Sequence, residues 1–431
     1  MRKIFRILLA LFILQGVLVV AAELRDLKVK NEKIPMIFER DNNLPIASMQ
    51  IIFKNSGSIT EKKAGLAKFC AKMFNEGTKS LGSVGFARAL ESKAIHLSAN
   101  SGTETFVFEV SSLKEQFEDA VKFLKDLLQD PNFTKEAFSK VKTMTLGNLK
   151  SKETDYDYIA ALHLKLLMYE GTPIGHPFLG DYESINSLTL KDVEDFAKER
   201  IVLDRAVVVI GGDMSEDEAK EFAKSVLEIL PKGDEGEIGF YYPKDRNETK
   251  VIKKDEIKQA YIDFGSPFYM KVNDPDNYKA KVASFILGAG GFGSRMMEEI
   301  RVKRGLAYSA YSRVNLTKSH SDFTGYLQTK IESGDEAVKI VREVIKDFVE
   351  NGVSEKELEQ AKKFLLGSEP LRSETLNQRL NRAFLEFYNG FGLGYYKKQL
   401  DLIESLTLKE LNDFIKKHKE LNDLSFSIVT K

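Results

Sequence analysis

The sequence predicts an α+β fold of two similar domains, each a mostly antiparallel sheet with helices packed on one face. An internal duplication is the first reason, because SLTLKDVEDF at 187–196 returns as SLTLKELNDF at 405–414. Strand-like alternation and helical periodicity follow each other in mixed order in both copies, which is typical of α+β domains. A polar, glycine-bearing linker at 231–237 separates the copies, so we expect domains at 23–232 and 233–431.

Further segments repeat in the same order. VKTMTLGN at 141–148 corresponds to AKKFLLGS at 361–368, and the strand that ends at Phe53 corresponds to one that ends at Phe264. The offset between the two copies is nearly the same for every one of these segments, which indicates two similar halves. A solenoid is excluded because its period is far shorter.

Residues 1–22 are typical of a secretory signal peptide. Basic residues precede an apolar run at 7–20, and Ala21 and Ala22 supply the small residues of a cleavage site. The run is short for a membrane span, so an uncleaved anchor is the weaker alternative. The chain has one cysteine, Cys70, and an exported chain without an internal disulfide fits a bacterial periplasm. Because Cys70 has apolar neighbours on a predicted helix, we expect it in the core.

In the first half, strand and helix patterns can be told apart by their periods. Phe106, Phe108 and Val110 alternate as on a strand, whereas the apolar residues between Phe117 and Leu128 follow the helical period. Such patterns predict strands at 47–53, 96–101, 105–110 and 206–210, helices at 84–92, 116–129 and 134–149, and a last strand at 426–429 in the second half.

The stretch 57–78, GSITEKKAGLAKFCAKMFNEGT, combines a turn and a helix in a recognisable frame. The frame consists of Gly57-Ser58, Glu61, GLA at 65–67, and the pairs MF and GT that follow. It resembles the inverted-motif zinc peptidases of the insulinase/pitrilysin family, which includes mitochondrial-processing-peptidase-like proteins. In that family an H-x-x-E-H motif directly follows Gly-Leu-Ala. Its two histidines bind zinc and its glutamate is the general base.

In this chain the five motif positions have lost that chemistry. Both histidine positions are lysines, Lys68 and Lys72, and the base position is Ala71. A protonated lysine has no free lone pair for a metal ion. The resemblance places the third ligand on a later helix, but the window 144–149 holds no carboxylate, and we expect Asn148 at that position. The resemblance therefore implies that this chain holds no metal and needs no cofactor by itself.

The second half keeps a motif better. SRMMEEIRVKRGLAYS at 294–309 is similar to the family's C-terminal segment, in which an arginine and a tyrosine hold the substrate against the zinc site. The matching residues are Arg301 and Tyr308, with Val302 where an acid is common. A guanidinium can bind a peptide carbonyl or carboxylate, and a phenol can donate to a developing oxyanion. The alternative is that Arg301 forms a structural salt bridge and Tyr308 begins a core strand.

The resemblance covers the whole mature chain and implies two domains that face each other, as in a clam-shell, around a chamber. It suggests a non-catalytic, substrate-binding subunit of a periplasmic zinc metallopeptidase complex. In this hypothesis the chain forms a heterodimer with a homologous, motif-bearing subunit and binds a peptide substrate through Arg301 and Tyr308. One alternative is a peptide-binding or assembly protein that plays no part in hydrolysis. An independently active peptidase would require zinc ligands that the motif lacks.

Other patterns carry less weight. Residues 288–293 match G-x-G-x-x-G, but a dinucleotide site needs a strand before the glycines, whereas 278–287 is helical in character. No two of the five histidines are three or four residues apart, so no helix carries a histidine pair for a metal. The 64 basic residues balance 64 acidic ones, which gives no indication of a nucleic-acid partner.

Overall fold

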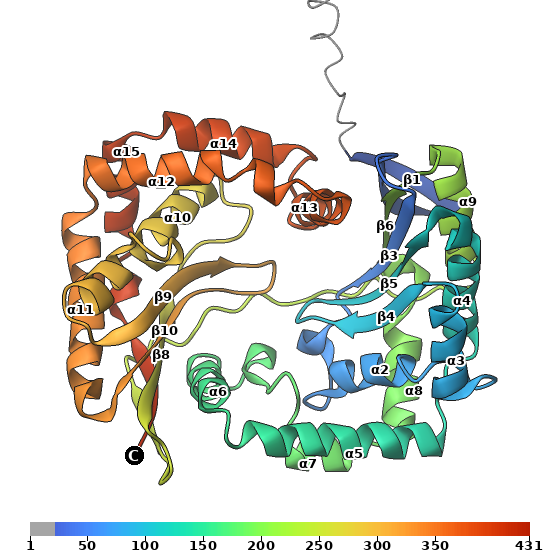
Figure 1. The fold of residues 1–431 in the computed structure, drawn as a ribbon, viewed down its shortest axis with the longest axis horizontal. Helices are drawn as coiled ribbons and strands as arrows, with labels where there is room; N and C mark the ends of the chain where they lie inside the picture. The colour runs from blue at the N-terminus through green and yellow to red at the C-terminus, as the bar shows by residue number, and fades with distance from the viewer. Residues whose placement is uncertain (1–21) are drawn as a thin grey trace, which may run out of the picture.

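The computed structural model describes residues 22–431, which form two sheets that face each other, with most of the helices on the outer sides (Figure 1). This is the predicted α+β architecture of two similar domains. The predicted signal peptide, residues 1–22, lies outside the described residues except for Ala22. Within residues 22–431, no helix has both the length and the apolar character that crossing a membrane requires.

The first sheet contains six strands in the order β1-β2-β6-β3-β5-β4. β2 and β6 run parallel, and all other neighbours are antiparallel. The strands predicted in this half all fall within observed ones. Their bounds are β1 Glu23–Val29, β2 Glu32–Arg40, β3 Ile46–Lys54, β4 His96–Ser101, β5 Thr105–Leu113 and β6 Ala206–Gly212.

The second sheet repeats this arrangement without an equivalent of β1. Its five strands have the order β7-β11-β8-β10-β9, and here too one pair, β7 and β11, is parallel. β9 lies at the open edge, as β4 does in the first sheet. The bounds are β7 Thr249–Lys253, β8 Gln259–Pro267, β9 Ala307–Leu316, β10 Ser321–Lys330 and β11 Ser425–Thr430.

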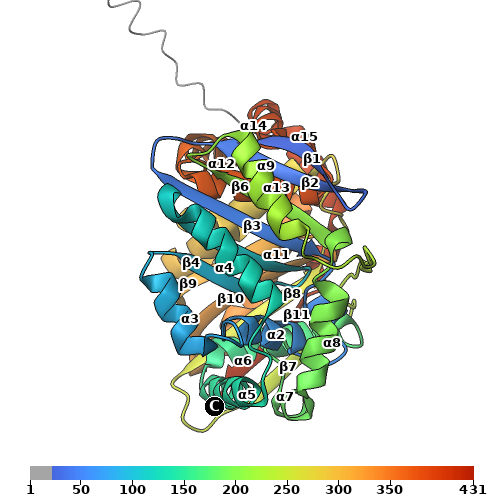
Figure 2. The ribbon, with the colours of Figure 1, turned by 90° about the vertical axis from the view of Figure 1, so that its right-hand side faces the viewer.

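Most helices of the first half cover the outer face of its sheet, with α4 and α9 in front of the strands in Figure 2. α5 begins one residue after Thr134, whose Oγ1 accepts a hydrogen bond from the backbone N–H of Ala137 at 3.2 Å, as an N-cap does. The bounds are α2 Leu66–Phe74, α3 Gly82–Glu91, α4 Phe117–Gln129, α5 Lys135–Lys152, α6 Tyr156–Met168, α7 Tyr182–Ser187, α8 Leu190–Arg200 and α9 Glu216–Leu227.

The duplicated SLTL segments begin corresponding helices. Thr189 caps α8 and Thr407 caps α15, and each forms a capping box with the acidic residue three positions later, Asp192 or Glu410. The repeat is therefore a helix-start signal as well as a trace of duplication. The helices of this half are α10 Asn277–Ser284, α11 Gly334–Asn351, α12 Glu355–Gly367, α13 Leu376–Tyr388, α14 Tyr395–Ser405 and α15 Leu408–Lys417.

Helices α6 and α13 correspond by position, since their first residues, Tyr156 and Leu376, are separated by the same offset as the repeated segments 141–148 and 361–368. Each helix packs against the sheet of the other half. Ile159 of α6 is buried with Val429 of β11, and Leu380 of α13 is buried with residues of the first sheet. Burying one large apolar side chain contributes about 1.5–3 kcal/mol, so this exchange joins the two halves firmly. Each half therefore contributes one helix to the sheet of the other, across the expected domain boundary at residue 232.

Polar contacts reinforce both exchanged helices. Arg379 of α13 donates to the carboxylates of Glu39 and Asp41 at the end of β2. Just after α6, the Tyr169 hydroxyl donates to Asp322 Oδ2 of β10 at 2.7 Å. Burial, together with the charge of Asp322, raises the pKa of Tyr169 and keeps the hydroxyl a donor. Arg379 thus makes a charged contact between the halves, and Tyr169 makes a hydrogen bond from a neutral donor.

Candidate functional site

The first candidate site is helix α2, where the resembled family carries its zinc ligands. Gly65 precedes the helix with a left-handed φ of 83°, and a Cβ there would lie 2.7 Å from the backbone N of Gly180. The Glu61 carboxylate accepts hydrogen bonds from the backbone N–H groups of Gly65 (2.8 Å) and Ala67 (2.9 Å). Burial raises the pKa of Glu61 to about 7, against the effect of these bonds. This part of the frame serves to begin the helix.

Lys68 and Lys72 lie one turn apart on the half-buried side of α2. Lys68 Nζ donates to Asn100 Oδ1 of β4 at 2.6 Å and lies 5.6 Å from the centre of the Phe178 ring. Lys72 Nζ donates to Thr145 Oγ1 of α5 at 3.0 Å. Burial lowers the pKa of both lysines, and at Lys72 the charge of Lys68 adds to the effect. Each ammonium group is therefore bonded to a neutral oxygen and repels its neighbour.

These residues do not fit a zinc ion. Zinc requires lone pairs from imidazole, thiolate or carboxylate groups, whereas the site offers two ammonium groups and a hydroxyl. Within the described part of the chain, no group of three or more His, Cys, Asp and Glu residues is placed to hold a metal. We therefore derive no catalytic step through a metal held by this chain.

The structure shows which residue of α5 contacts the α2 lysines. Asn148 is exposed on α5, whereas Thr145, one turn earlier, is buried and contacts Lys72. The residue of α5 that meets the α2 pair is therefore Thr145. The sequence could not distinguish these neighbours because nothing in the window 144–149 resembled a ligand.

The remaining motif positions are part of the core. Ala71 and Cys70 are both buried in the cluster between the first sheet and its helices. Burial raises the pKa of the Cys70 thiol, which makes it a poor nucleophile. The prediction that Cys70 is a core residue is confirmed, and the position of the family's general base is a methyl group packed against other apolar side chains.

The second candidate site is the segment that carries Arg301 and Tyr308. Arg301 lies in the π-helical turn Met297–Val302, and Tyr308 is the second residue of β9. Gly305 turns the chain back with a φ of 62°, its N–H donating to the Arg301 carbonyl at 2.9 Å. A left-handed φ favours glycine, so this turn explains the Gly in the motif. The turn brings the side chains of Arg301 and Tyr308 together.

The guanidinium of Arg301 is held between two aromatic rings. Its Cζ lies 4.4 Å from the centre of the Tyr308 ring and 4.6 Å from that of Phe292. Both rings are highly exposed, Tyr308 to 82% and Phe292 to 73%. Stacking of this kind orients the planar cation without neutralising its charge.

Within residues 22–431, Arg301 forms no ion pair, while the neighbouring Lys303 and Arg304 both pair with Glu299. The structure therefore does not support the alternative in which Arg301 forms a structural salt bridge. Tyr308 does begin a strand, as the alternative predicted, but its side chain faces solvent and not the core. The pair is thus available to bind a group that this chain does not provide.

Sequence reasoning missed Phe292. It lies in the glycine-rich stretch 288–293, for whose aromatic ring no role was predicted. A large aromatic residue among glycines, close to the Arg/Tyr motif, was the available signal. In the structure Gly288 belongs to the π-helical turn Phe285–Ala289, and a Cβ there would lie 2.0 Å from Ser312 Oγ, so its role is close packing against β9.

The structure does not bring the two candidate sites together. Lys68 and Lys72 belong to the first half, whereas Arg301 lies just before the edge strand β9 of the second half and Tyr308 lies at its start (Figure 1). An arginine and a phenol at an open sheet edge can bind a peptide carbonyl or stabilise an oxyanion. They cannot activate water by themselves, so they require a reacting centre from elsewhere.

Comparisons with known proteins agree with the resemblance. The model of the insulinase family (peptidase family M16) matches residues 36–182, and the model of the peptidase M16 inactive domain matches residues 187–365. A Helicobacter pylori protein named "Non-peptidase homolog YmxG" is 43% identical over 429 residues, which cover 99% of this chain and 98% of that one. A Bacillus subtilis protein named "Uncharacterized zinc protease YmxG" is 25% identical over 374 residues, 86% of this chain and 90% of that one.

A solved structure has the same fold. The peptidase M16 inactive domain from Pseudomonas fluorescens superposes with a TM-score of 0.87 at 24% identity, covering 95% of this chain and 98% of that one. At that identity the likeness concerns the fold alone. The family models together cover more than half of the chain, and the Helicobacter pylori relative covers nearly all of it. The chain therefore belongs to the insulinase family of peptidases, family M16.

Proposed function

We propose that this chain is the non-catalytic, substrate-binding subunit of a zinc metallopeptidase complex. It completes the peptide site of a homologous partner that carries the intact H-x-x-E-H motif. One observation carries the proposal: Arg301 stands unpaired among residues 22–431, oriented between the rings of Phe292 and Tyr308 at the molecular surface.

The arrangement suits the binding of a peptide bond under attack. The stacked guanidinium keeps its donors free for a peptide carbonyl or carboxylate. The exposed Tyr308 hydroxyl has no hydrogen-bond partner within the described chain and is free to donate to an oxyanion. A partner that docks against this edge would exclude water, which strengthens both interactions.

Two further findings support the non-catalytic part of the proposal. Lys68, Ala71, Lys72 and Thr145 occupy the motif region of the first half and provide neither a metal site nor a base. The Helicobacter pylori relative, similar over nearly its whole length, is itself named a non-peptidase homologue. The proposed location is the periplasm, supported by the signal-like residues 1–22 and tested by osmotic-shock fractionation of cells with and without that segment.

The central experiment mixes the purified chain with a motif-bearing homologue from the same genome and measures hydrolysis of a quenched fluorescent peptide. We expect activity well above that of either protein alone. Tyr308→Phe should lower the activity of the mixture by about 10²-fold, the usual effect of removing one oxyanion donor. Arg301→Lys should also lose most of the gain, because an ammonium group lacks the planar fork.

Gel filtration of the same mixtures separates assembly from catalysis. A variant that still forms the complex but loses activity supports a direct role for the side chain. Lys409→Ala, which removes an exposed charge on α15, serves as the surface control and should leave activity unchanged. A stable complex whose activity does not depend on Arg301 or Tyr308 would favour the alternative of an assembly or scaffold protein.

A further inference from the structure

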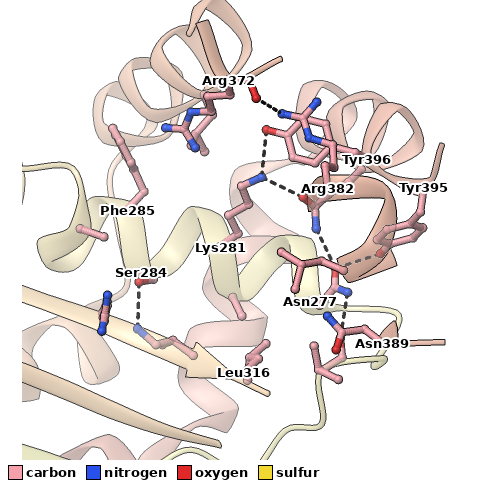
Figure 3. A pocket seen from close by; sticks show the side chains of 18 of the residues that line it. Asn277, Lys281, Ser284, Phe285, Leu316, Arg372, Arg382, Asn389, Tyr395 and Tyr396 are labelled. Atoms are coloured by element: carbon pink, nitrogen blue, oxygen red, sulfur yellow. Dashed lines mark hydrogen bonds between the residues drawn. The ribbon is translucent and has the colours of Figure 1, made fainter. Parts of the chain in front are cut away.

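The second half contains a cavity of about 930 Å³ between β9, α10, α12, α13 and α14. Figure 3 shows Lys281 of α10 at its centre, with Tyr395 and Tyr396 of α14 on one side and Phe285 on the other. This volume lies in the range of small-molecule and short-peptide sites. The cavity is separate from the Arg301–Tyr308 pair, and the inference below does not depend on the proposed function.

The cavity occupies the position in the second half that α2 and its surroundings occupy in the first. Lys68 lies over the ring of Phe178, and Lys281 lies 4.3 Å from the ring centre of Tyr396. Phe178 and Tyr396 are separated by the same offset as the two SLTL segments that follow them in the sequence. The duplicated fold thus places Lys281 where the first half has Lys68.

The surroundings of the two lysines differ. One turn after Lys68 stands Lys72, bonded to Thr145 of α5. One turn after Lys281 stands Phe285, whose ring contacts that of Phe364 on α12 at a centroid distance of 4.9 Å. The second half therefore has an apolar wall where the first half has a second ammonium group.

Positive charge dominates the polar part of the cavity. Lys281, Arg313 and Arg372 line it, and none of the three has a carboxylate within ion-pair distance among residues 22–431. Lys281 Nζ instead donates to Gln399 Oε1 at 2.8 Å. Burial lowers the pKa of Lys281 to about 8, which means that the unliganded site disfavours the charged form of this side chain. The charge of Arg372 also acts on Lys281, so an anion placed here would stabilise the ammonium group and engage this free guanidinium.

The carboxylates near the cavity are already engaged. Glu369 pairs with Arg382. Glu386 accepts hydrogen bonds from the backbone N–H groups of Gly394 (2.7 Å) and Tyr396 (2.6 Å), which satisfies the start of α14. Glu369 faces Lys281 but pairs with Arg382, and neither carboxylate forms an ion pair with Lys281, so the lysine can still pair with a ligand.

The remaining lining points to a peptide as the source of the anion. Phe364 and Leu385 line the cavity although both are more than half exposed, which leaves apolar surface for a ligand side chain. Amide side chains that line the cavity, such as those of Asn381 and Asn389, can bond to peptide groups. Inorganic phosphate would contact the cationic side chains but not the apolar and amide groups of the lining.

We propose that this cavity binds the C-terminal end of a peptide, with the free α-carboxylate at Lys281 and Arg372 and a large apolar last side chain against Phe285 and Phe364.

Calorimetric titration of the full purified chain with N-acetyl-Ala-Ala-Phe tests this proposal. We expect binding of the free acid to be at least tenfold tighter than binding of its C-terminal amide, which has the same apolar side chain without the charge. N-acetyl-Ala-Ala-Gly, which keeps the carboxylate, should also bind at least tenfold more weakly. Inorganic phosphate should bind more weakly than the peptide acid. Equal affinity for acid and amide, or phosphate binding as tight as peptide binding, would overturn the proposal.

Matched variants locate the site. Lys281→Gln should weaken binding of the peptide acid at least tenfold, and Arg372→Gln, a change at an exposed position, should weaken it severalfold. Lys68→Gln at the corresponding position of the first half should leave affinity unchanged. If Lys281→Gln does not fold, by circular dichroism, the Arg372→Gln variant and the acid–amide comparison still decide the question. Unchanged affinity in Arg372→Gln together with equal binding of acid and amide would place the ligand elsewhere.

Discussion

The first half of the chain carries Lys68 and Lys72 on the half-buried side of α2. The corresponding helix of the second half, α10, carries Lys281, and Phe285 follows one turn later. In the first half each ammonium group is bonded to a neutral side chain, Asn100 or Thr145. In the second half the ammonium group lies at a cavity with unpaired arginines and aromatic walls. The two halves have therefore kept a lysine at equivalent backbone positions, and the surrounding side chains determine what each position can bind.

The comparison also concerns how the two halves hold each other. α6 and α13 occupy corresponding places and pack on opposite sheets, but α13 is tied by an arginine with two carboxylates and α6 by a tyrosine with one. The experiments below test both contrasts, beginning with the largest expected effect.

The first prediction concerns zinc ligands restored on α2 and α5, which would remove the difference between the first half of this chain and a zinc-binding relative. The triple variant Lys68→His, Lys72→His, Thr145→Glu should bind zinc far more tightly than the triple with Asn148→Glu in place of Thr145→Glu. Losing an outer partner of a ligand already costs about 10–100-fold in affinity, so losing a ligand should cost on the order of 10³-fold, about 4 kcal/mol. Competition with a zinc-chelating dye measures both affinities. Equal affinities would show that Thr145 does not occupy the third position.

Removing Arg379 should weaken the attachment of α13. Glu39 is only 2% exposed, so Arg379→Met leaves a buried carboxylate without its partner. Breaking such a buried pair costs about 3 kcal/mol or more in free energy of unfolding, measured by urea unfolding. Exposed Lys409→Met should unfold at the same urea concentration as the unaltered chain. No difference between the two variants would mean that α13 is held by its apolar face alone.

Tyr169→Phe tests the polar contact beside α6. The variant removes one hydrogen bond to Asp322 and keeps the ring, so we expect a loss of about 1.5–3 kcal/mol in free energy of unfolding, typical for a bond to a charged group. Tyr182→Phe, which removes an exposed tyrosine–glutamate bond, is the control and should not change the urea midpoint. A Tyr169→Phe effect as large as that of Arg379→Met would erase the contrast between the two attachments.

The smallest effect concerns pH. Lys281 is charged below its pKa of about 8 and neutral above it, so affinity for the peptide acid should be constant at lower pH and fall about tenfold towards pH 9.5. The other groups facing Lys281 are Arg372, Arg382, Glu369 and Tyr396. The arginines stay charged, and burial raises the pKa of Tyr396 to about 12.

The control for this prediction is Lys281→Gln. Its weaker affinity for the peptide acid should not change with pH over the same range. A fall of the same steepness in that variant would assign the pH dependence to another group. Calorimetry at pH 7 and pH 9.5 with both proteins gives the four affinities required.

Much of the fold could be predicted because local chemistry determined it. Thr189 and Thr407 cap their helices within their own segments, and the alternating residues of β5 needed only a period of two. The Arg301–Tyr308 pair was predictable for the same reason, since a short turn at Gly305 joins the two residues. Phe292 escaped prediction because its contact with Arg301 depends on how a separate loop folds back.

The amino-acid sequence by itself determined the duplication, several strands and helices of the first half, the loss of zinc-binding side chains and the survival of Arg301 and Tyr308. Only the tertiary structure decided that α6 and α13 exchange sheets, that Thr145 and not Asn148 meets Lys72, and that Lys281 borders a cavity. The physical reason is one of range. Caps, turns and periodicity act over a few neighbouring positions, whereas the partner of a buried face depends on packing between segments that lie far apart in the sequence.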